Sequence, residues 1–255
     1  MPKESFSDNE QILNYDDAVI YGSDLKLVNS RTEWLNDACI HFYMNVLRNR
    51  LNQSPRSNTE FLFMDPSVVS FFMHQCSDEE DFEDFKKGTI LPNHGFVFIP
   101  VNNAMRRRSE FDNDYFPNGS HWSLLVVAIC KSGCGSGTGI ERHRQYWHFD
   151  SVKHSGNSFA AKDIADKLSA VFPHDSKKIV QEADTPQQEN GHDCGIHMLE
   201  TMKLLCSDDT SNEKCMDKAF DLQLQENKLQ IFVKANPGFC QRLRKEIVQE
   251  ILDHA

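Results

Sequence analysis

A cysteine, a glutamine and a glycine are placed where thiol chemistry would need them. Cys194 lies at the junction between a polar loop, TPQQENGHD, and an apolar helical segment. Unpaired amides and the macrodipole at a helix N-terminus stabilise a thiolate. Gln188, six residues earlier, carries a side-chain amide that could meet a developing oxyanion together with the Cys194 backbone N–H, and Gly195 removes side-chain bulk beside the sulfur. Cys194 is the candidate nucleophile; the alternative is a buried cysteine that caps the helix.

A histidine and an aspartate are the candidate base and its partner. The runs 121–130 and 144–151 are typical of two strands, the first almost continuously apolar and the second alternating, and we expect them to form an antiparallel hairpin. If Ile129 lies opposite Arg144, then Asp150 lies across from Ser123 and one pair away from His121. A neighbouring carboxylate fixes the imidazole tautomer and supports an imidazolium. The alternative is an ordinary hydrogen-bonded pair at the surface, and this interpretation would be preferred if the cysteine and glutamine were not present.

The elements that must position these side chains follow from the hydrophobic pattern. Ser30 and Glu33 form a capping-box pattern ahead of a helix over 34–47. Asp65-Pro66 indicates a second helix start, and the acidic run 78–84 indicates a solvated connector. Further segments are predicted as strands (96–101 and 177–183) and helices (158–172 and 195–206). Helices at both ends surround a central run of strands, so we expect an α+β class with a mostly antiparallel sheet. Residues 1–14 are predicted as a flexible tail and 15–255 as one domain.

Composition excludes several classes of protein. With 27 basic against 38 acidic residues, the net charge of -11 disfavours nucleic acid as a partner, and the run Arg106–Arg108 is too short to reverse this. No apolar window is long enough to span a membrane, and the first residues lack a signal-peptide core, so we expect a cytoplasmic or nuclear protein that is not secreted. The eight cysteines are expected to be thiols. Cys130, Cys134 and His143 offer too few ligands for zinc, so no metal is expected.

Four motifs together resemble a known family. WLND at 34–37, HWSLLVV at 121–127, HFDS at 148–151 and QQENGHDCG at 187–195 are similar, in that order, to the landmarks of the Ulp-type (sentrin-specific) cysteine proteases. The similarity covers roughly residues 15–250. An LPN before the strand at 96–101 and a helix of the AKDIADKL type are most similar to the deneddylating branch. The resemblance implies a papain-like (Ulp/adenain-type) fold, with a central, mostly antiparallel sheet flanked by helices.

The resemblance also implies a role for each candidate residue. His121 matches the general base or imidazolium, Asp150 its orienting partner, Cys194 the nucleophile and Gln188 the oxyanion donor. The substrate-binding set consists of Trp34, Asp37, Trp122 and Gly195. The two tryptophans match the aromatic walls of a narrow channel for a Gly-Gly tail, since indoles on both sides admit only glycine without a clash. The aspartate matches an acidic residue that pairs with an arginine in that tail.

These expectations define a reaction and its rivals. The predicted activity is cleavage of a ubiquitin-like modifier, the neddylation modifier, after its C-terminal Gly-Gly, both to mature the precursor and to release the modifier from lysines of cullin-type targets. The first alternative is the same reaction on SUMO. The others are an acetyltransferase with the same order of His, acid and Cys, and a catalytically inactive modifier-binding module. No metal or organic cofactor is expected, and neither is a membrane partner; the protein is expected to be a monomer.

Overall fold

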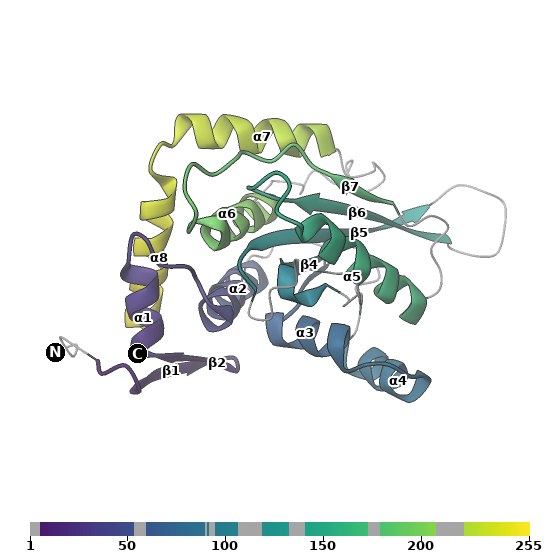
Figure 1. Cartoon of the computed structure of the whole chain (residues 1–255), viewed down its shortest axis with the longest axis horizontal. Helices are drawn as coiled ribbons and strands as arrows, with labels where there is room; N and C mark the ends of the chain where they lie inside the picture. Colours follow the sequence, from purple (N-terminus) through teal and green to yellow (C-terminus); the bar gives the residue numbers. More distant parts are fainter. Residues whose placement is uncertain are drawn as a thin grey trace.

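A mixed five-stranded sheet forms the centre of the molecule (Figure 1). The computed structural model describes residues 6–53, 60–89, 91, 95–106, 119–132, 141–172, 179–207 and 222–255. In spatial order the strands are β3 (Glu60–Phe63), β4 (Gly95–Asn102), β5 (Trp122–Ser132), β6 (Glu141–Phe149) and β7 (Val180–Glu182). The long strands β4, β5 and β6 pair antiparallel, whereas the short edge strands β3 and β7 pair in parallel. The α+β class is confirmed, and the longest pairings are the antiparallel ones.

The hairpin of β5 and β6 has the register expected from the sequence. Ile129 lies opposite Arg144, and the pairing continues to Leu124 opposite Phe149. His121 directly precedes β5, and Asp150 directly follows β6. Because antiparallel neighbours bring the start of one strand beside the end of the next, both residues lie at the same edge of the sheet.

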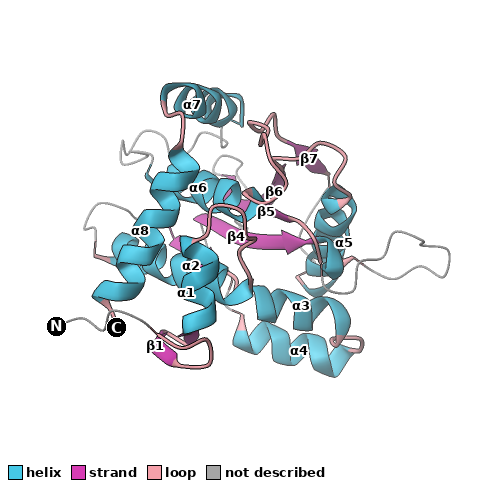
Figure 2. Ribbon diagram, turned by 60° about the vertical axis from the view of Figure 1, so that its left-hand side comes forward, coloured by secondary structure: helices cyan, strands magenta, loops and turns pink. Residues whose placement is uncertain are grey.

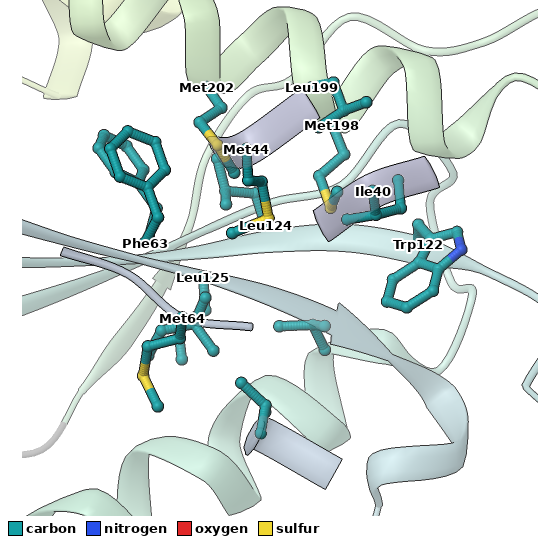
Figure 3. Packing of buried hydrophobic residues seen from close by; sticks show 14 of the residues in the cluster. Ile40, Met44, Phe63, Met64, Trp122, Leu124, Leu125, Met198, Leu199 and Met202 are labelled. Atoms are coloured by element: carbon teal, nitrogen blue, oxygen red, sulfur yellow. The ribbon is translucent and has the colours of Figure 1, made fainter. Parts of the chain in front are cut away.

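Helices cover both faces of the sheet, so its central strands are apolar on both sides (Figure 2). Contacts with one face come from α2 (Asp37–Asn52) and α6 (Cys194–Ser207), and contacts with the other come from α3 (Pro66–His74) and α5 (Asn157–Val171). Figure 3 shows the result at β5: Ile40 and Met198 lie on the side of Leu124, whereas Leu125 points the opposite way. This packing anchors α6, whose first residue is Cys194, against the strand that follows His121.

The N-terminal segment is more ordered than the sequence indicated. Strand β1 (Gln11–Tyr15) pairs with β2 (Ala18–Tyr21), so the predicted tail over 1–14 is wrong for residues 11–14. Leu13 is buried in this hairpin. The first five residues lie outside the described part of the chain. A two-stranded hairpin with few apolar residues gives too short an alternation to be recognised, and here packing against α2 stabilises it.

The first predicted helix begins later than expected. A separate helix, α1 (Gly22–Asn29), comes first, and α2 begins at Asp37 with the side chain of Asn36 as its N-cap, accepting from the Cys39 backbone N–H at 3.0 Å. The capping box predicted at Ser30 and Glu33 is therefore wrong. Asparagine is as good an N-cap as serine, so both positions were compatible with the sequence. The consequence is functional, since Trp34 lies in a loop and not on a helix.

Two further segments complete the comparison. Asp65 caps α3 as predicted, accepting from the Ser67 N–H at 2.7 Å. The acidic run 78–84 is not a connector, because it forms most of α4 (Glu79–Gly88). A capping box between Asp78 and Asp81 starts this helix.

The C-terminal part of the chain consists of two helices, α7 (Leu222–Ala235) and α8 (Phe239–Asp253). A short 3-10 turn, η1 (Asn103–Met105), follows β4.

The described residues contain neither a cluster of metal-binding side chains nor a helix that could span a membrane. No group of three or more His, Cys, Asp or Glu side chains in that part of the chain could hold a metal ion. Cys134 and the side chains of Cys130 and His143, which the sequence singled out, lie outside it. Among the same residues, no helix has both the length and the apolar composition needed to cross a bilayer.

Candidate active site

His121 and Asp150 form a direct, largely buried pair. The His121 Nε2 and Asp150 Oδ1 atoms are 2.6 Å apart, and both side chains are about nine-tenths buried. Strand register had placed them as neighbours, and the structure brings them into hydrogen-bonding contact. Since Nε2 is occupied by the carboxylate, Nδ1 is the ring nitrogen that remains for another partner.

That partner is Cys194. Burial lowers the pKa of His121, but hydrogen bonds to Asp150 and to Cys194, together with their charges, outweigh it and raise the pKa to about 9. The imidazolium is therefore the favoured form at neutral pH. Cys194 is the first residue of α6 and is 2% exposed. Its backbone N–H belongs to the first turn of the helix, where no intrahelical acceptor exists.

Asp150 is held by three donors. Besides His121, the Val152 backbone N–H donates to Oδ1 at 2.8 Å, and the Ser155 hydroxyl donates to Oδ2 at 2.5 Å. Burial raises the pKa of Asp150, but the hydrogen bond and charge of His121 and the hydrogen bonds from Ser155 and Val152 more than reverse this, so the pKa lies below its usual value. The carboxylate is thus an oriented anion that stays charged over the physiological range.

His121 is also positioned through its backbone. Asn157, a fully buried residue at the start of α5, donates to the carbonyls of Val101 and His121 and to the Ser123 hydroxyl. Neither Asn157 nor Ser155 was recognised from the sequence. The signal available was the polar turn VKHSGN that follows Asp150, where the structure places Ser155 and Asn157 beside the start of α5.

Gln188 lies in the loop that leads to Cys194. Its backbone N–H donates to the Ser151 carbonyl at 2.9 Å, and its side-chain oxygen accepts from the Ser151 hydroxyl at 2.8 Å. The amide nitrogen donates to the Asn190 carbonyl at 2.5 Å. Because a primary amide carries two N–H groups, a second donor remains for an oxyanion. The Asn190 carbonyl can only accept, so this contact fixes which end of the amide is the nitrogen.

The two tryptophans lie in different environments and bond to different loops. Trp34 is 45% exposed, and its indole N–H donates to the Gly191 carbonyl at 2.5 Å, three residues before Cys194. Trp122 is only 5% exposed, and its indole N–H donates to the Leu35 carbonyl at 2.9 Å. Residues 34–35 therefore connect the buried indole with the loop before the sulfur. Trp34 is available to a substrate, whereas Trp122 is mainly a core residue.

The Asp37 carboxyl has no basic partner among the described residues. Asp37 is the first residue of α2, and burial followed by the negative charge of Asp65 raises its pKa. No Lys or Arg side chain of the described part of the chain forms an ion pair with it. A basic group from a substrate would offset both the desolvation of the carboxylate and its repulsion by Asp65.

Gly195 has a packing role that differs from the expected one. A Cβ atom on Gly195 would lie 3.2 Å from Leu35 Cβ and 3.2 Å from Ile40 Cδ1. Helix α6 therefore packs so closely against α2 and against the loop before α2 that a Cβ atom at position 195 would be crowded, which accounts for the glycine. The missing side chain makes room for the core at this point, and the assignment of Gly195 as a substrate-binding residue stays a prediction.

His148 and Arg106 both have partners within the chain. His148 is fully buried between Glu182 and the Ser123 hydroxyl, at 2.8 Å from each, as expected of a structural histidine. The guanidinium of Arg106 lies 4.7 Å from the centre of the Phe159 ring. Arg107 and Arg108, the other members of the basic run, lie outside the described residues.

Comparison with curated proteins supports the resemblance independently of this geometry. The chain is 30% identical over 200 residues to NEDD8-specific protease 1 of Arabidopsis thaliana, covering 78% of this chain and 77% of the relative. It is 30% identical over 258 residues to the probable sentrin-specific protease 8 of Dictyostelium discoideum, covering 94% and 96%. Human sentrin-specific protease 8 is 28% identical over 197 residues, covering 76% and 81%.

Solved structures share the fold. A de-sumoylating protease matches with a TM-score of 0.60 at 15% identity, covering 92% of this chain and 85% of that one. The C-terminal Ulp1 protease domain in complex with Smt3, the yeast ortholog of SUMO, matches with a TM-score of 0.54 at 19% identity, covering 97% and 89%. Residues 33–235 match the Ulp1 protease family, C-terminal catalytic domain. The chain therefore belongs to the Ulp1 protease family and is a cysteine protease.

Proposed function

We propose that this protease hydrolyses the bond that follows the C-terminal Gly-Gly of the neddylation modifier, in its precursor and in its conjugates with lysine side chains. The observation that carries the proposal is the convergence of three side chains from distant parts of the chain. His121 contacts both Asp150 and Cys194, and the sulfur lies at the first turn of α6.

The first half of the reaction forms a thioester. His121 Nδ1 accepts the proton of Cys194, and the resulting thiolate attacks the carbonyl carbon of the terminal glycine. The oxyanion that forms accepts from the Gln188 side-chain amide and the Cys194 backbone N–H. As the tetrahedral intermediate collapses, the C–N bond breaks and the His121 imidazolium donates its proton to the departing amine.

The second half regenerates the enzyme. Neutral His121 removes a proton from water, and the hydroxide attacks the thioester carbonyl at the same oxyanion site. The C–S bond then breaks, the modifier leaves with a free carboxylate, and the thiolate pairs again with the imidazolium. Asp150 stays ionised throughout and keeps Nδ1 directed at the sulfur.

Substrate selection combines an aromatic wall with an acidic residue. Trp34, which is exposed and hydrogen-bonded to the loop that leads to Cys194, would lie over the Gly-Gly segment, where any side chain would collide with the ring. Asp37, raised in pKa and lacking a basic partner in the described part of the chain, would bind a basic residue earlier in the tail. The Arabidopsis thaliana relative, at 30% identity, is named a NEDD8-specific protease, whereas the SUMO protease structures share only the fold, so the neddylation modifier is preferred over SUMO.

A panel of C-terminal fluorogenic conjugates tests the choice of modifier. The neddylation modifier, SUMO and ubiquitin are compared at equal ionic strength, with kcat/KM as the readout. We expect the neddylation modifier to exceed both others by at least about 100-fold, as is typical where a site rejects a misplaced polar group. A higher kcat/KM for SUMO would transfer the proposal to SUMO, and hydrolysis of none of the three would end it.

Substitution of Trp34 tests the channel. Trp34→Ala is expected to raise KM for the modifier substrate about tenfold, since a lost aromatic contact of this kind corresponds to about 1.4 kcal/mol. The melting temperature should change little, because the side chain is 45% exposed. Trp34→Phe, which keeps a ring but lacks the indole N–H, is the control and should retain most of the affinity. Trp122→Ala is less informative, because a cavity left by this buried ring costs about 3–5 kcal/mol of stability.

An unchanged KM in Trp34→Ala would contradict the proposed channel. A matched fall in melting temperature would instead show that the ring stabilises the loop and does not bind substrate.

A further inference from the structure

The residue before the candidate nucleophile belongs to a buried ion pair. Asp193, the residue before Cys194, accepts through Oδ1 from two nitrogens of Arg244, Nε at 3.1 Å and one terminal nitrogen at 2.8 Å. Both side chains are about 97% buried. Arg244 lies on α8, 51 residues further along the chain, and contacts of α8 with α1 and α6 bring it there (Figure 1). A buried charge pair is tolerated only where the geometry satisfies its remaining donors and acceptors.

The remaining donors of Arg244 reach the loop that carries Trp34. Its two terminal nitrogens donate to the carbonyls of Leu27 and Val28 at the end of α1, and to the Glu33 carbonyl at 2.8 Å. One guanidinium therefore joins α8, the end of α1, the residue before Trp34 and the residue before Cys194. A rigid, planar set of five N–H groups suits this role, and lysine could not reproduce it.

The other oxygen of Asp193 continues the network toward Gln188. The Asn190 side-chain nitrogen donates to Asp193 Oδ2 at 2.9 Å. The Asn190 side-chain oxygen accepts from the backbone N–H groups of His192 and Asp193, each at 3.0 Å. These bonds orient the Asn190 peptide, whose carbonyl accepts from the Gln188 amide at 2.5 Å. The chain of contacts thus runs from Arg244 through Asp193 and Asn190 to the amide proposed as oxyanion donor.

We propose that Asn190 and Asp193 are positioning residues, which fix the Gln188 amide against the first turn of α6 and are themselves anchored by Arg244. Neither touches the reacting atoms. Oxyanion stabilisation depends on donors that are oriented before the reaction, so loss of this orientation lowers the rate of the chemical step while substrate binding remains. The inference rests on the proposed role of Gln188.

Asn190 is the residue to test first, because it is exposed and the ion pair is not. Removing one member of a buried pair costs about 3–5 kcal/mol, so changes at Arg244 would mix folding with positioning. For Asn190→Ala we expect kcat for the modifier substrate to fall about tenfold, a fraction of the 10²–10³-fold cost of losing an oxyanion donor outright. KM should stay within about twofold, because the walls of the tail site are intact.

Asp78→Ala is the matched control. Asp78 is also an exposed residue whose side chain accepts from a backbone N–H three residues later, but it caps α4 and has no link to the candidate site. Both variants lose a side-chain acceptor for a nearby backbone N–H, for which about 1 kcal/mol is typical, so their melting temperatures should fall by similar amounts. Only Asn190→Ala should lower kcat.

An exchange of the two side chains provides a rescue. In Asp193→Asn, two amides face each other and the bond to Asn190 is lost, while an oxygen remains for Arg244. Adding Asn190→Asp restores a donor at position 193 and an acceptor at position 190. We expect the double variant to recover at least about threefold in kcat over Asp193→Asn alone, the coupling expected of two residues in one network. A purely structural role would not produce this recovery at equal melting temperature.

Inactivation by iodoacetamide separates the network from the nucleophile. Alkylation of Cys194 needs the thiolate but no oxyanion donor, so its rate in Asn190→Ala should match that of the wild type. The inference would be overturned by a kcat within twofold of wild type in Asn190→Ala, by an equal loss in Asp78→Ala, or by a double variant no better than Asp193→Asn. Failure of the proposed function is distinct, since the wild-type protein would then cleave no modifier.

Discussion

Cys194→Ala is expected to abolish cleavage of every modifier substrate, by at least about 10⁴-fold, while the modifier still binds with an affinity within about threefold of wild type. The sulfur supplies the bond that forms, and no water molecule positioned in its place has comparable nucleophilicity. Removing one sulfur atom from a buried site leaves a small cavity, so we expect little change in fold. Hydrolysis rates and calorimetric titration with the intact modifier measure the two effects.

No other described thiol is prepared to replace it. Burial raises the pKa of the remaining cysteines in the described part of the chain, Cys39, Cys76, Cys206 and Cys240. Each is therefore protonated at neutral pH and a weak nucleophile. Cys206 lies on the same helix as Cys194, so Cys206→Ala is the matched control and should retain full kcat/KM. Residual cleavage by Cys194→Ala above about 1% of wild type, or loss of modifier binding, would contradict the assignment.

Asp150→Asn is expected to lower kcat/KM about 10³-fold at neutral pH and to move the alkaline limb of the pH profile to lower pH. Burial alone lowers the pKa of His121, and the hydrogen bonds and charges of Asp150 and Cys194 raise it to about 9. Removing the carboxylate charge removes part of that increase, so the imidazolium is lost at a lower pH. An asparagine amide can also present a donor to the ring and hold the wrong tautomer, which is costly in such a pair.

The same pKa governs stability. Because the pKa of His121 is higher in the folded protein than its usual value of 6.5, the charged pair stabilises the fold fully below pH 6.5 and this contribution is lost as the pH rises through about 9. Asp150→Asn should therefore flatten the fall in melting temperature between these limits. Melting curves recorded at intervals across that pH range measure the effect on stability. The pH profile of kcat/KM over the same range measures the shift of the alkaline limb.

Ser155→Ala is the control for charge. It removes the hydroxyl that donates to Asp150 Oδ2 but leaves the carboxylate and its bond to His121 in place. We expect a loss in kcat/KM of less than about tenfold, with the alkaline limb close to that of wild type. An unshifted alkaline limb in Asp150→Asn would show that Asp150 does not set the pKa of His121.

Three predictions from the sequence depended only on local patterns, and the structure confirms them. The strand alternation in 144–151 and the apolar run after His121 were sufficient to place Asp150 beside His121, because the side-chain period of a strand and antiparallel pairing determine the neighbours. The polar-to-apolar change at Cys194 located the start of α6. Asp65-Pro66 marked the start of α3, because a side-chain cap followed by proline is a local signal.

Errors arose where a local pattern had two compatible outcomes. Ser30 and Asn36 are both good helix caps, and only the packing of α2 and α6 around Gly195 decides that the helix starts after Asn36. The run 78–84 carries the charge of a solvated loop, yet Phe85 buries against Phe72 of α3, and this contact stabilises α4. Both outcomes depend on partners distant in the sequence.

The amino-acid order alone therefore determined the chemistry: the types of the reacting groups, their place at the ends of elements, and the fold class that brings strand ends together. The tertiary structure decided how those groups are supported. Arg244 has the spacing of an ordinary charged helix residue, and only the contacts of α8 with α1 and α6 bury it against Asp193. The hydrogen bonds of a strand or a helix join residues at a regular spacing, so a local sequence pattern predicts them. The partner of a buried charge lies on a distant segment, so it depends on which surfaces pack together in the fold.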